Sequence, residues 1–470
     1  MEWTPADLAT DAGGVLERDG GGTISGAFID SRSPVPGALF VPIVAARDGH
    51  EFIGHAVRGG ARAVLIQRDR AVPNVGAHVT VVAVEDTQRA LDALAVAARA
   101  RVRGPVVAIT GSNGKTTTRS YVQAVLASAF RSVLCTQGNL NNHLGVPLTL
   151  LGTPHAPDAM VLELGMSAPG ENAHLARMVA PTVGVITSVG IEHFEFFESI
   201  EGIADAEFEV AAHIHRDGAL VIPCDEALLT ARAPRRACAD LMPVGPCADA
   251  RVRLTRAWID GSHDAPETHA EVTMHDGKTW TLRLRSFGLH NARNAVAALG
   301  VASALGLPIP AAIAALEQVV PVGDRGRSHR VGPHLVVSDC YNANPSSMEA
   351  ALSSFATLRA QVQGPLIAVL GDMLELGPRT DDFHREVGAR AAALGLDALI
   401  GVGEASRHAV AAAREAGVET FAAGRDEIDE VVSRVRGALA DGAPGAVLVK
   451  ASRGLRLERV VEALRAAAEA

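Results

Sequence analysis

Short apolar runs alternate with longer alanine-rich segments along most of the chain. The runs are rich in Val, Ile and Leu, as buried strands are. The clearest of them read VVAIT, AMVLELG, VGVIT, ALVIP, HLVVSD, LIAVLGD, ALIGVG and AVLVK. Strands that alternate with helices are typical of parallel sheets with helices on their faces. The pattern therefore predicts an α/β fold.

The runs form two series with a smaller unit before them. The first series begins at Pro105 and ends with a helical segment at 291–306, and the second begins near His334 and ends with a helix after Arg453. Between them, segment 306–328 contains Pro, Gly and a charged turn, which suits a boundary. Before Pro105, the runs GALFVPI, ARAVLIQ and VTVVAVED precede another helical segment. We predict three domains, at residues 1–103, 104–320 and 321–470.

Composition excludes several classes of protein. With 470 residues, 48% of them hydrophobic, the chain can form several cores. A net charge of −10 and the lack of a Lys/Arg cluster argue against a nucleic-acid partner. No apolar run reaches the ~18 residues of a membrane span, and the polar N-terminus is unlike a signal peptide. The odd number of cysteines, without C-x-x-C spacing, predicts free thiols and a cytoplasmic protein: Cys135, Cys224, Cys238, Cys247 and Cys340.

The segment VVAITGSNGKTTTRSYVQAVLASAF, residues 106–130, has the form of a phosphate-binding loop. A buried strand leads into a glycine-rich turn and then a helix, whose N-terminal N–H groups can bind an anion. Lys115 can neutralise phosphate charge, and the Thr116 hydroxyl can bind Mg²⁺. The first glycine of the general pattern would fall at Ile109, and a turn that merely joins strand to helix is the alternative. We expect ATP to contact Gly111, Ser112, Asn113, Gly114, Lys115, Thr116 and Thr117.

The loop TGSNGKTTT resembles the ATP loop of the Mur ligase family, ATP-dependent amide-forming enzymes of peptidoglycan precursor synthesis. Further segments resemble that family in its order: GNLNNHLGVPLTLL, LELGMSAPGE, GLHNARNAVAAL, DCYNANPSSMEAAL, LGDMLELG and VKASR. The motifs YNANP and GDMLELG, with no Asp-Asn-Pro-Arg motif, resemble the members that add D-alanyl-D-alanine. The resemblance implies a uridine-nucleotide-binding N-terminal domain, a central P-loop ATPase sheet and a Rossmann-like C-terminal domain. It implies a ligase that joins D-alanyl-D-alanine to UDP-N-acetylmuramoyl-tripeptide through an acyl phosphate.

The resemblance also implies two Mg²⁺ ions, because a carboxylate and a triphosphate must be brought together. Thr116 and Glu163 match the ligands of one ion, although Glu163 could instead cap the next helix. His193 matches a ligand of the second ion. Fourteen residues further on, where relatives have a carbamylated lysine, stands Glu207. Its shorter reach requires a closer helix, a bridging water or replacement by Asp205 or Glu209, and we expect Lys115, His193 and Glu207 to be catalytic.

Other sites follow from the resemblance by position. For the nucleotide they are His290, Asn291, Asn294, Arg325, Asp339, Tyr341 and Asn342, where Asn291 could instead cap a helix and Arg327 or Arg330 could replace Arg325. For the UDP-linked substrate they are Ser31, Arg32, Asp48 and His50. Three amides are expected to approach the peptide of this substrate or the metal-bound phosphates, and could instead form turns: Asn139, Asn141 and Asn142. For D-alanyl-D-alanine they are Asp372, Glu375, His384, Lys450, Ser452 and Arg453.

Two other functions stay open. One is a related ligase with another acceptor, of the folylpolyglutamate or cyanophycin type, which the uridine-type N-terminal segment argues against. The other is a nucleotide-dependent binding protein without ligase chemistry, which Glu207 in place of lysine could suggest. We expect a monomer whose domains close around ATP and the UDP-linked substrate.

Overall fold

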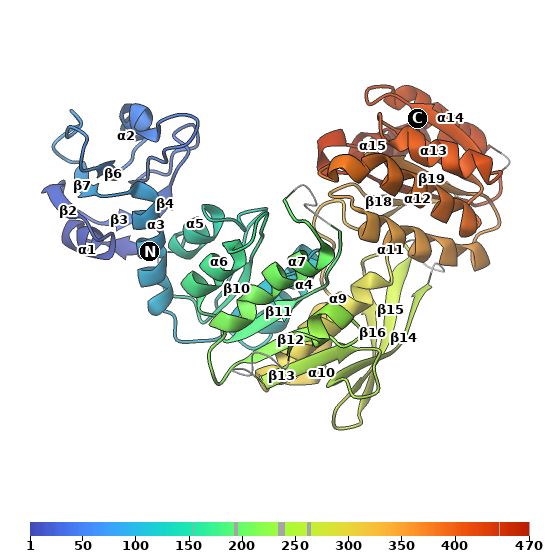
Figure 1. The fold of residues 1–470 in the computed structure, drawn as a ribbon, viewed down its shortest axis with the longest axis horizontal. Helices are drawn as coiled ribbons and strands as arrows, with labels where there is room; N and C mark the ends of the chain where they lie inside the picture. Colours follow the sequence, from blue (N-terminus) through green and yellow to red (C-terminus); the bar gives the residue numbers. More distant parts are fainter. Residues whose placement is uncertain (154, 192–195, 234–239, 261–264, 441, 470) are drawn as a thin grey trace.

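The computed structural model describes residues 1–153, 155–191, 196–233, 240–260, 265–440 and 442–469. Its three larger sheets follow one another along the molecule, from the blue N-terminal part to the red C-terminal part (Figure 1). Each sheet falls within one of the three predicted ranges, and the boundaries themselves stay predictions. The α/β fold is confirmed.

The N-terminal part has a five-stranded sheet of order β2-β7-β6-β5-β4 and a small β1-β3 pair. Its helix α3 begins at an Asp86 cap and packs toward α5 and α6 of the central part, with which it shares one hydrophobic core. The elements are β1 (Glu2–Trp3), α1 (Pro5–Asp11), β2 (Val15–Arg18), β3 (Ile24–Ser25), β4 (Ala27–Phe28), β5 (Leu39–Phe40), η1 (Gly49–Phe52), α2 (Ile53–Arg58), β6 (Ala63–Gln67), β7 (Thr80–Val84) and α3 (Thr87–Ala100).

The central sheet has nine strands in the described residues, in the order β16-β15-β14-β13-β12-β11-β8-β10-β9. The helices are α4 (Lys115–Ala127), α5 (Gly145–Leu151), α6 (Glu171–Val179), α7 (Ile200–Phe208), η2 (Glu209–His213), α8 (Ala227–Thr230), α9 (His290–Ala304) and α10 (Ile309–Leu316). The strands are β8 (Val106–Thr110), β9 (Val133–Cys135), β10 (Ala159–Glu163), β11 (Val183–Ile186), β12 (Ala219–Pro223), β13 (Asp240–Gly245), β14 (Val252–Asp260), β15 (Glu267–Met274) and β16 (Thr279–Leu284).

Strand β8 lies in the middle of the parallel part of this sheet, between β10 and β11. Val107 and Ile109 pack on the side of α4, α9 and α10, whereas Val106 and Ala108 pack on the side of α5 and α6. Burial on both faces explains why the strand is apolar throughout. The position also places the loop after β8 at the carboxyl edge of the sheet, where open α/β sheets bind ligands.

The hairpin strands β14, β15 and β16 are antiparallel, so the sheet is mixed rather than wholly parallel. Alternation of buried and half-buried residues along β15 shows a strand with one covered face. That period of two is the sequence signal of such a strand, and a search for continuous apolar runs overlooks it.

The C-terminal sheet has the order β17-β18-β22-β19-β20-β21, and all its described pairs are parallel except β17 with β18. The strands are β17 (Arg327–Val331), β18 (His334–Asp339), β19 (Leu366–Gly371), β20 (Ala398–Val402), β21 (Glu419–Ala423) and β22 (Ala446–Lys450). The helical segments are α11 (Pro345–Ala356), η4 (Thr357–Ala360), η5 (Gly377–Arg379), α12 (Thr380–Ala393), α13 (Ser406–Glu415), α14 (Ile428–Ala438), η6 (Arg453–Leu455) and α15 (Glu458–Glu469).

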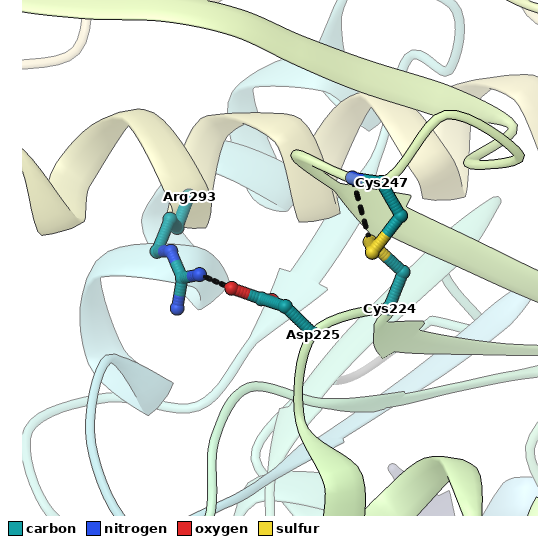
Figure 2. The surroundings of a disulfide bond; sticks show 4 residues. All are labelled: Cys224, Asp225, Cys247 and Arg293. Carbon is teal, nitrogen blue, oxygen red and sulfur yellow. Dashed lines mark hydrogen bonds and ion pairs between the residues drawn. A yellow bond between two sulfur atoms is a disulfide. The ribbon is translucent and has the colours of Figure 1, made fainter.

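A disulfide joins Cys224 to Cys247 and overturns the expectation that every thiol is free (Figure 2). Their Cα atoms lie 6.1 Å apart. Cys224 follows β12 and Cys247 follows β13, and these strands are parallel neighbours, so their ends meet at one sheet edge. Spacing along the chain could not reveal this pair. Cys135 and Cys340 are free and buried, and Cys238 lies outside the described residues.

The segment that leaves β12 is also linked to helix α9. Asp225, the residue after Cys224, forms an ion pair with Arg293 of α9, as Figure 2 shows. Cys224 and Asp225 therefore connect the β12–β13 edge to the helix that reaches the phosphate-binding loop.

None of the helices within the described ranges combines the length and the apolar character that a membrane span needs.

Candidate active site

The loop after β8 needs its two glycines. Gly111 has φ +122° and Gly114 has φ +87°, both in the left-handed region that favours glycine. A Cβ atom at Gly111 would collide with the Thr187 side chain, and one at Gly114 would collide with the Asn294 side chain. The loop is therefore packed between the end of β11 and the start of α9.

Three amides of this loop already have acceptors within the protein. The N–H of Gly111 donates to Glu207 Oε2 at 2.8 Å, and those of Ser112 and Asn113 donate to Ser188 O and Oγ, each at 2.9 Å. The first N–H groups of α4, from Lys115 onward, lack intrahelical acceptors, as at every helix N-terminus. This turn, rather than the preceding loop, is the part of the motif suited to bind phosphate.

Lys115 begins helix α4 and folds back over the loop. Its Nζ donates to the carbonyl oxygens of Gly111 and Ser112. The ammonium group thus lies at the mouth of the loop, where it can neutralise phosphate charge. Thr116, the next residue, is buried, and its Oγ1 donates to Glu163 Oε1 at 3.2 Å.

Glu163 ends strand β10 and is 3% exposed. Its Oε1 also accepts from Asn141 Nδ2 at 3.0 Å, and its Oε2 lies 3.2 Å from an Arg119 guanidinium nitrogen. Within the described residues Oε2 accepts no hydrogen bond, although it is buried. The side chain therefore contacts α4 and the loop before α5. Within the described part of the chain, no hydrogen bond supports the alternative that it caps the next helix, α6.

Glu207 lies directly beneath the phosphate-binding loop and is 1% exposed. Its Oε2 accepts from Gly111 N, Thr110 Oγ1 and Asn172 Nδ2, and its Oε1 is buried with no hydrogen-bond partner in the described part of the chain. Burial raises the pKa of this carboxyl, and the nearby Lys115 charge opposes that rise. Helix α7 itself thus brings the carboxylate to the loop.

The acids that could have replaced Glu207 are engaged elsewhere. Asp205 forms an exposed ion pair with Arg232 at 2.8 Å. Glu209 accepts from Gly170 N at 2.8 Å and Ala173 N at 3.0 Å, at the start of α6. Of the three acids, Glu207 contacts the phosphate-binding loop, and the way in which it would reach a metal ion stays a prediction. His193 lies outside the described residues.

The start of α9 borders the loop. Asn294 is buried against Gly114, and its Nδ2 donates to Asn291 Oδ1 at 3.3 Å. Asn291 Nδ2 donates to Phe287 O, and the residue at the helix cap is Leu289, so Asn291 is not the N-cap. His290 Nδ1 is buried without a hydrogen-bond partner in the described residues, and burial lowers the pKa of this imidazole.

On the C-terminal side, Arg325 and Tyr341 are stacked. The Arg325 guanidinium lies 3.5 Å from the centre of the Tyr341 ring. Burial lowers the pKa of Arg325, and the charges of Tyr341 and Glu163 oppose this shift in part. Lys450 is 2% exposed, and its Nζ bonds to Asp339 Oδ2 at 2.7 Å and to the Asn342 carbonyl at 2.9 Å. The predicted nucleotide residues Asp339 and Asn342 thus meet at the ends of the parallel neighbours β18 and β22.

The loops of the two parts are in direct contact. Asn113 Nδ2 donates to Ser346 Oγ, and Asn344 Nδ2 donates to Asn113 Oδ1, both at 2.9 Å. Asn344 is also the N-cap of α11. The phosphate-binding loop is therefore joined to the C-terminal part through an exchange of side-chain hydrogen bonds.

Several residues predicted for D-alanyl-D-alanine have structural partners. The Asp372 carboxylate accepts from Glu404 N and Ser406 N, at the start of α13. Ser452 Oγ accepts from Leu374 N at 3.0 Å. Glu375 has φ +63°, which is rare for a residue with a side chain. The exposed Arg453 pairs with Glu458 at 3.0 Å.

His384 is also held on both sides. Its Nδ1 lies 2.7 Å from Thr380 O, and its Nε2 accepts from Met373 N at 3.0 Å. Only the neutral tautomer with the proton on Nδ1 satisfies both contacts. Burial lowers the pKa of the ring, so the structure favours that neutral form.

The N-terminal residues form two small groups. His50 Nδ1 and Arg70 pair with the two oxygens of Asp48, each at 2.7 Å. Arg32 is exposed and pairs with Asp30, while the buried Ser31 carbonyl contacts His55. All lie in segments that follow the parallel neighbours β4, β5 and β6, at one edge of the sheet.

The loop before α5 divides its three amides. Asn141 reaches Glu163, as described above, whereas Asn142 Oδ1 accepts from Leu144 N and Gly145 N and so shapes the turn. The Asn139 carbonyl accepts from Asn141 N at 2.8 Å. The turn-forming alternative therefore holds for Asn142, and Asn141 lies beside the carboxylate.

Two residues of the site were missed from the sequence. Arg119 follows Lys115 by one helical turn, and a cation on the buried face of a helix was the available signal. Asn172 is fully buried on α6, and its Nδ2 donates to Thr110 Oγ1, the Ala206 carbonyl and Glu207. An isolated asparagine in a helix gives no such signal in a sequence.

Two family descriptions match most of the central and C-terminal parts. Residues 109–302 match the Mur ligase middle domain, and residues 326–453 match the Mur ligase glutamate ligase domain. The UDP-N-acetylmuramoyl-tripeptide–D-alanyl-D-alanine ligase of Bacillus subtilis is 33% identical over 450 residues, 94% of this chain and 93% of its own. The ligase of the same name from Mycobacterium tuberculosis H37Rv is 32% identical and covers 99% and 98%.

Solved structures agree with this likeness. MurF from Acinetobacter baumannii is 28% identical and superposes with a TM-score of 0.87 over 99% of both chains. The MurF ligase of Thermotoga maritima, solved in complex with ADP, is 28% identical and gives a TM-score of 0.82 over 95% of this chain and 98% of its own. The phosphate-binding loop, the buried carboxylates and these likenesses agree: the chain belongs to the Mur ligase family.

Proposed function

We propose that the chain is an ATP-dependent ligase that joins D-alanyl-D-alanine to UDP-N-acetylmuramoyl-tripeptide in peptidoglycan precursor synthesis. The observation that carries the ATP part is the convergence of Lys115, Thr116, Glu163 and Glu207 on one loop. The likeness to D-alanyl-D-alanine ligases along nearly the whole chain supports the two substrates. The ADP complex of the Thermotoga maritima relative supports the nucleotide.

The residues present fit a divalent cation that prefers oxygen ligands. Two carboxylate oxygens, Glu163 Oε2 and Glu207 Oε1, are buried without a hydrogen bond in the described residues, and Thr116 Oγ1 lies beside Glu163. Carboxylate and hydroxyl oxygens are ligands that Mg²⁺ accepts, together with phosphate oxygens. Among the described residues, no group of three or more His, Cys, Asp or Glu side chains could hold a metal ion by itself. Phosphate oxygens of the nucleotide would supply further ligands. When bound, Mg²⁺ would neutralise charge on the transferring phosphoryl group.

The chain's own groups can stabilise both steps of the reaction. In the first, a substrate carboxylate oxygen attacks the γ-phosphorus of ATP, and ADP leaves. In the second, the amine attacks the carbonyl carbon of the acyl phosphate, and phosphate leaves as the amide forms. Lys115 and the first N–H groups of α4 can bind the phosphate oxygens that gain charge in the first step. Arg325, stacked on Tyr341, supplies a further cation from the C-terminal side.

Phosphate release in the presence of ATP and Mg²⁺ tests this proposal. We expect release only when UDP-N-acetylmuramoyl-tripeptide and D-alanyl-D-alanine are both present, with one amide formed per phosphate. Release that needs neither substrate would indicate a bare ATPase. Nucleotide binding without release under any combination would favour the binding-protein alternative.

Glu207 gives a second test of the same site. A glutamate already supplies the carboxylate that relatives are expected to obtain by carbamylation of lysine, so activity should not depend on dissolved bicarbonate. Glu207→Ala should lose activity at every bicarbonate concentration, and Glu207→Lys should regain part of it only when bicarbonate is added. An unimpaired Glu207→Ala variant would remove Glu207 from the mechanism.

A further inference from the structure

Arg119 is a buried cation in the site to which the proposed reaction gives no role. It lies on α4, three residues after Thr116, and is 5% exposed. Residues three and four apart share one face of a helix, so Arg119 points to the same side as Lys115 and Thr116. Burial of an arginine, which cannot lose its proton, requires compensating partners.

The guanidinium group contacts two segments at once. Its NH1 atom donates to the Gly138 carbonyl at 3.1 Å and lies 3.2 Å from Glu163 Oε2. The first contact holds the start of the loop that carries Asn141, and the second holds the carboxylate that Asn141 also contacts. Arg119 thus ties α4, the end of β10 and the 138–142 loop together.

The contact with Glu163 neutralises charge and leaves one carboxylate oxygen, Oε2, without a hydrogen bond in the described residues. It is an ion pair outside hydrogen-bond geometry, so Glu163 Oε2 keeps its lone pairs for another ligand. Meanwhile Thr116 and Asn141 hold Oε1. The Nε–H of Arg119 is itself buried and has no acceptor among the described residues. The hydrogen bonds of Arg119 are therefore incomplete, and they do not by themselves explain why an arginine is buried here.

We propose that Arg119 is a positioning residue for Mg²⁺–nucleotide binding. It fixes the orientation of the Glu163 carboxylate, in which Oε2 accepts no hydrogen bond from the described residues, and anchors the 138–142 loop before the nucleotide arrives. This inference rests on the proposed nucleotide site. Its consequence is that Arg119 acts through Glu163, so its effect on binding exists only when Mg²⁺ is present and Glu163 can bind it.

Binding of a fluorescent ADP analogue, titrated with and without MgCl₂, measures that effect. In Arg119→Met we expect the Mg²⁺-dependent gain in affinity to fall by about 10-fold or more, as is typical when a residue that orients a metal ligand is removed. Affinity without Mg²⁺ should change little. Arg119→Lys, which keeps the charge but not the planar fork, should restore part of the gain.

Two further variants separate this role from simple packing. Arg99→Met removes a half-buried arginine of α3, whose guanidinium donates to the Ala180 carbonyl. This control should leave the Mg²⁺-dependent gain in affinity unchanged. Glu163→Gln should lose the gain by itself, and adding Arg119→Met should cause no further loss.

Several outcomes would overturn the inference. If Arg119→Met kept the full Mg²⁺-dependent gain in affinity for the ADP analogue, Arg119 would have a packing role alone. If the losses in Arg119→Met and Glu163→Gln added up in the double variant, Arg119 would act independently of Glu163. If Arg119→Met does not fold, Arg119→Lys in the wild-type and Glu163→Gln backgrounds decides, since equal losses in both would contradict the proposal. Wild-type protein that binds Mg²⁺–ADP but forms no amide would contradict the proposed ligase reaction alone, and the binding series would still judge Arg119.

Discussion

The carboxylates beside the phosphate-binding loop differ from the polar groups predicted to bind D-alanyl-D-alanine. Glu163 and Glu207 each keep one buried oxygen without a hydrogen bond in the described residues. By contrast, Asp372 and His384 use their polar atoms for backbone contacts within the C-terminal part. Buried polar groups are normally satisfied, so an unsatisfied one needs an explanation, and for the two carboxylates at the phosphate-binding loop we infer a ligand. The first region is thus prepared for a ligand, and the second holds its own loops in position.

The largest expected effect concerns the C-terminal region. Lys450→Met removes the ammonium group that pairs with Asp339, and leaves a carboxylate with 16% of its side chain exposed without that partner. Loss of one partner of a buried ion pair typically costs about 3–5 kcal/mol of unfolding free energy. Urea unfolding should show this loss, whereas Lys278→Met, which breaks the exposed ion pair with Asp276, should leave the unfolding free energy nearly unchanged. If Lys450→Met were as stable as the wild type, Lys450 would belong with the ligand-binding groups instead.

The next effect concerns the loop and should appear in rate rather than stability. Lys115→Met removes the cation at the mouth of the loop, and we expect kcat to fall roughly 10²–10³-fold, as when a group that stabilises transition-state charge is lost. Steady-state kinetics with both substrates measure this, and circular dichroism confirms the fold. A variant with wild-type kcat would show that Lys115 serves the loop's shape alone.

A smaller effect depends on pH through His384. Burial lowers its pKa below the usual 6.5, so the folded protein binds this proton less tightly than the unfolded chain. The stability that the buried neutral ring of His384 contributes is complete above pH 6.5. It is lost as the pH falls from 6.5 toward the lowered pKa of the folded protein. The slope from this one group cannot exceed about 1.4 kcal/mol per pH unit.

Unfolding free energies measured between pH 5 and 7.5 test this dependence. His384→Gln should flatten the slope below pH 6.5, and His215→Gln, at a largely exposed histidine, should leave it unchanged. The charges of Asp372, Asp381 and His408 also affect the pKa of His384. The same series in Asp381→Asn measures the contribution of Asp381. A slope unaffected by His384→Gln would exclude this residue as its source.

The smallest effect concerns Asp372. Asp372→Ala removes the acceptor of two N–H groups at the start of α13 and should cost about 1 kcal/mol, the usual value for a lost helix cap. Thermal unfolding measures this cost, and the KM for D-alanyl-D-alanine should change little. A large rise in KM with unchanged stability would move Asp372 to the substrate site and weaken the contrast between the two regions.

Much of the fold was predictable because burial leaves a local record. Strands β8, β10, β11, β12, β18, β19, β20 and β22 fall on the predicted apolar runs. The antiparallel strands β14 to β16 were missed, since a strand with one exposed face alternates rather than forming a continuous apolar run. Of the candidate site, Lys115, Thr116, Glu163 and Glu207 meet at the predicted loop, whereas Arg119 and Asn172 carried no motif to mark them.

By itself, the sequence determined the order of motifs, the phosphate-binding loop and the strands around it, because these depend on neighbours along the chain. Only the tertiary structure decided that Cys224 forms a disulfide with Cys247. It also decided that Glu207 accepts a hydrogen bond from Gly111, 96 positions away, whereas Glu209 accepts one from Gly170. Such contacts depend on the order of strands in the sheet and on how closely α7 packs beneath the loop. Spacing along the chain does not encode either of these, so the open and the satisfied polar groups can be told apart only in three dimensions.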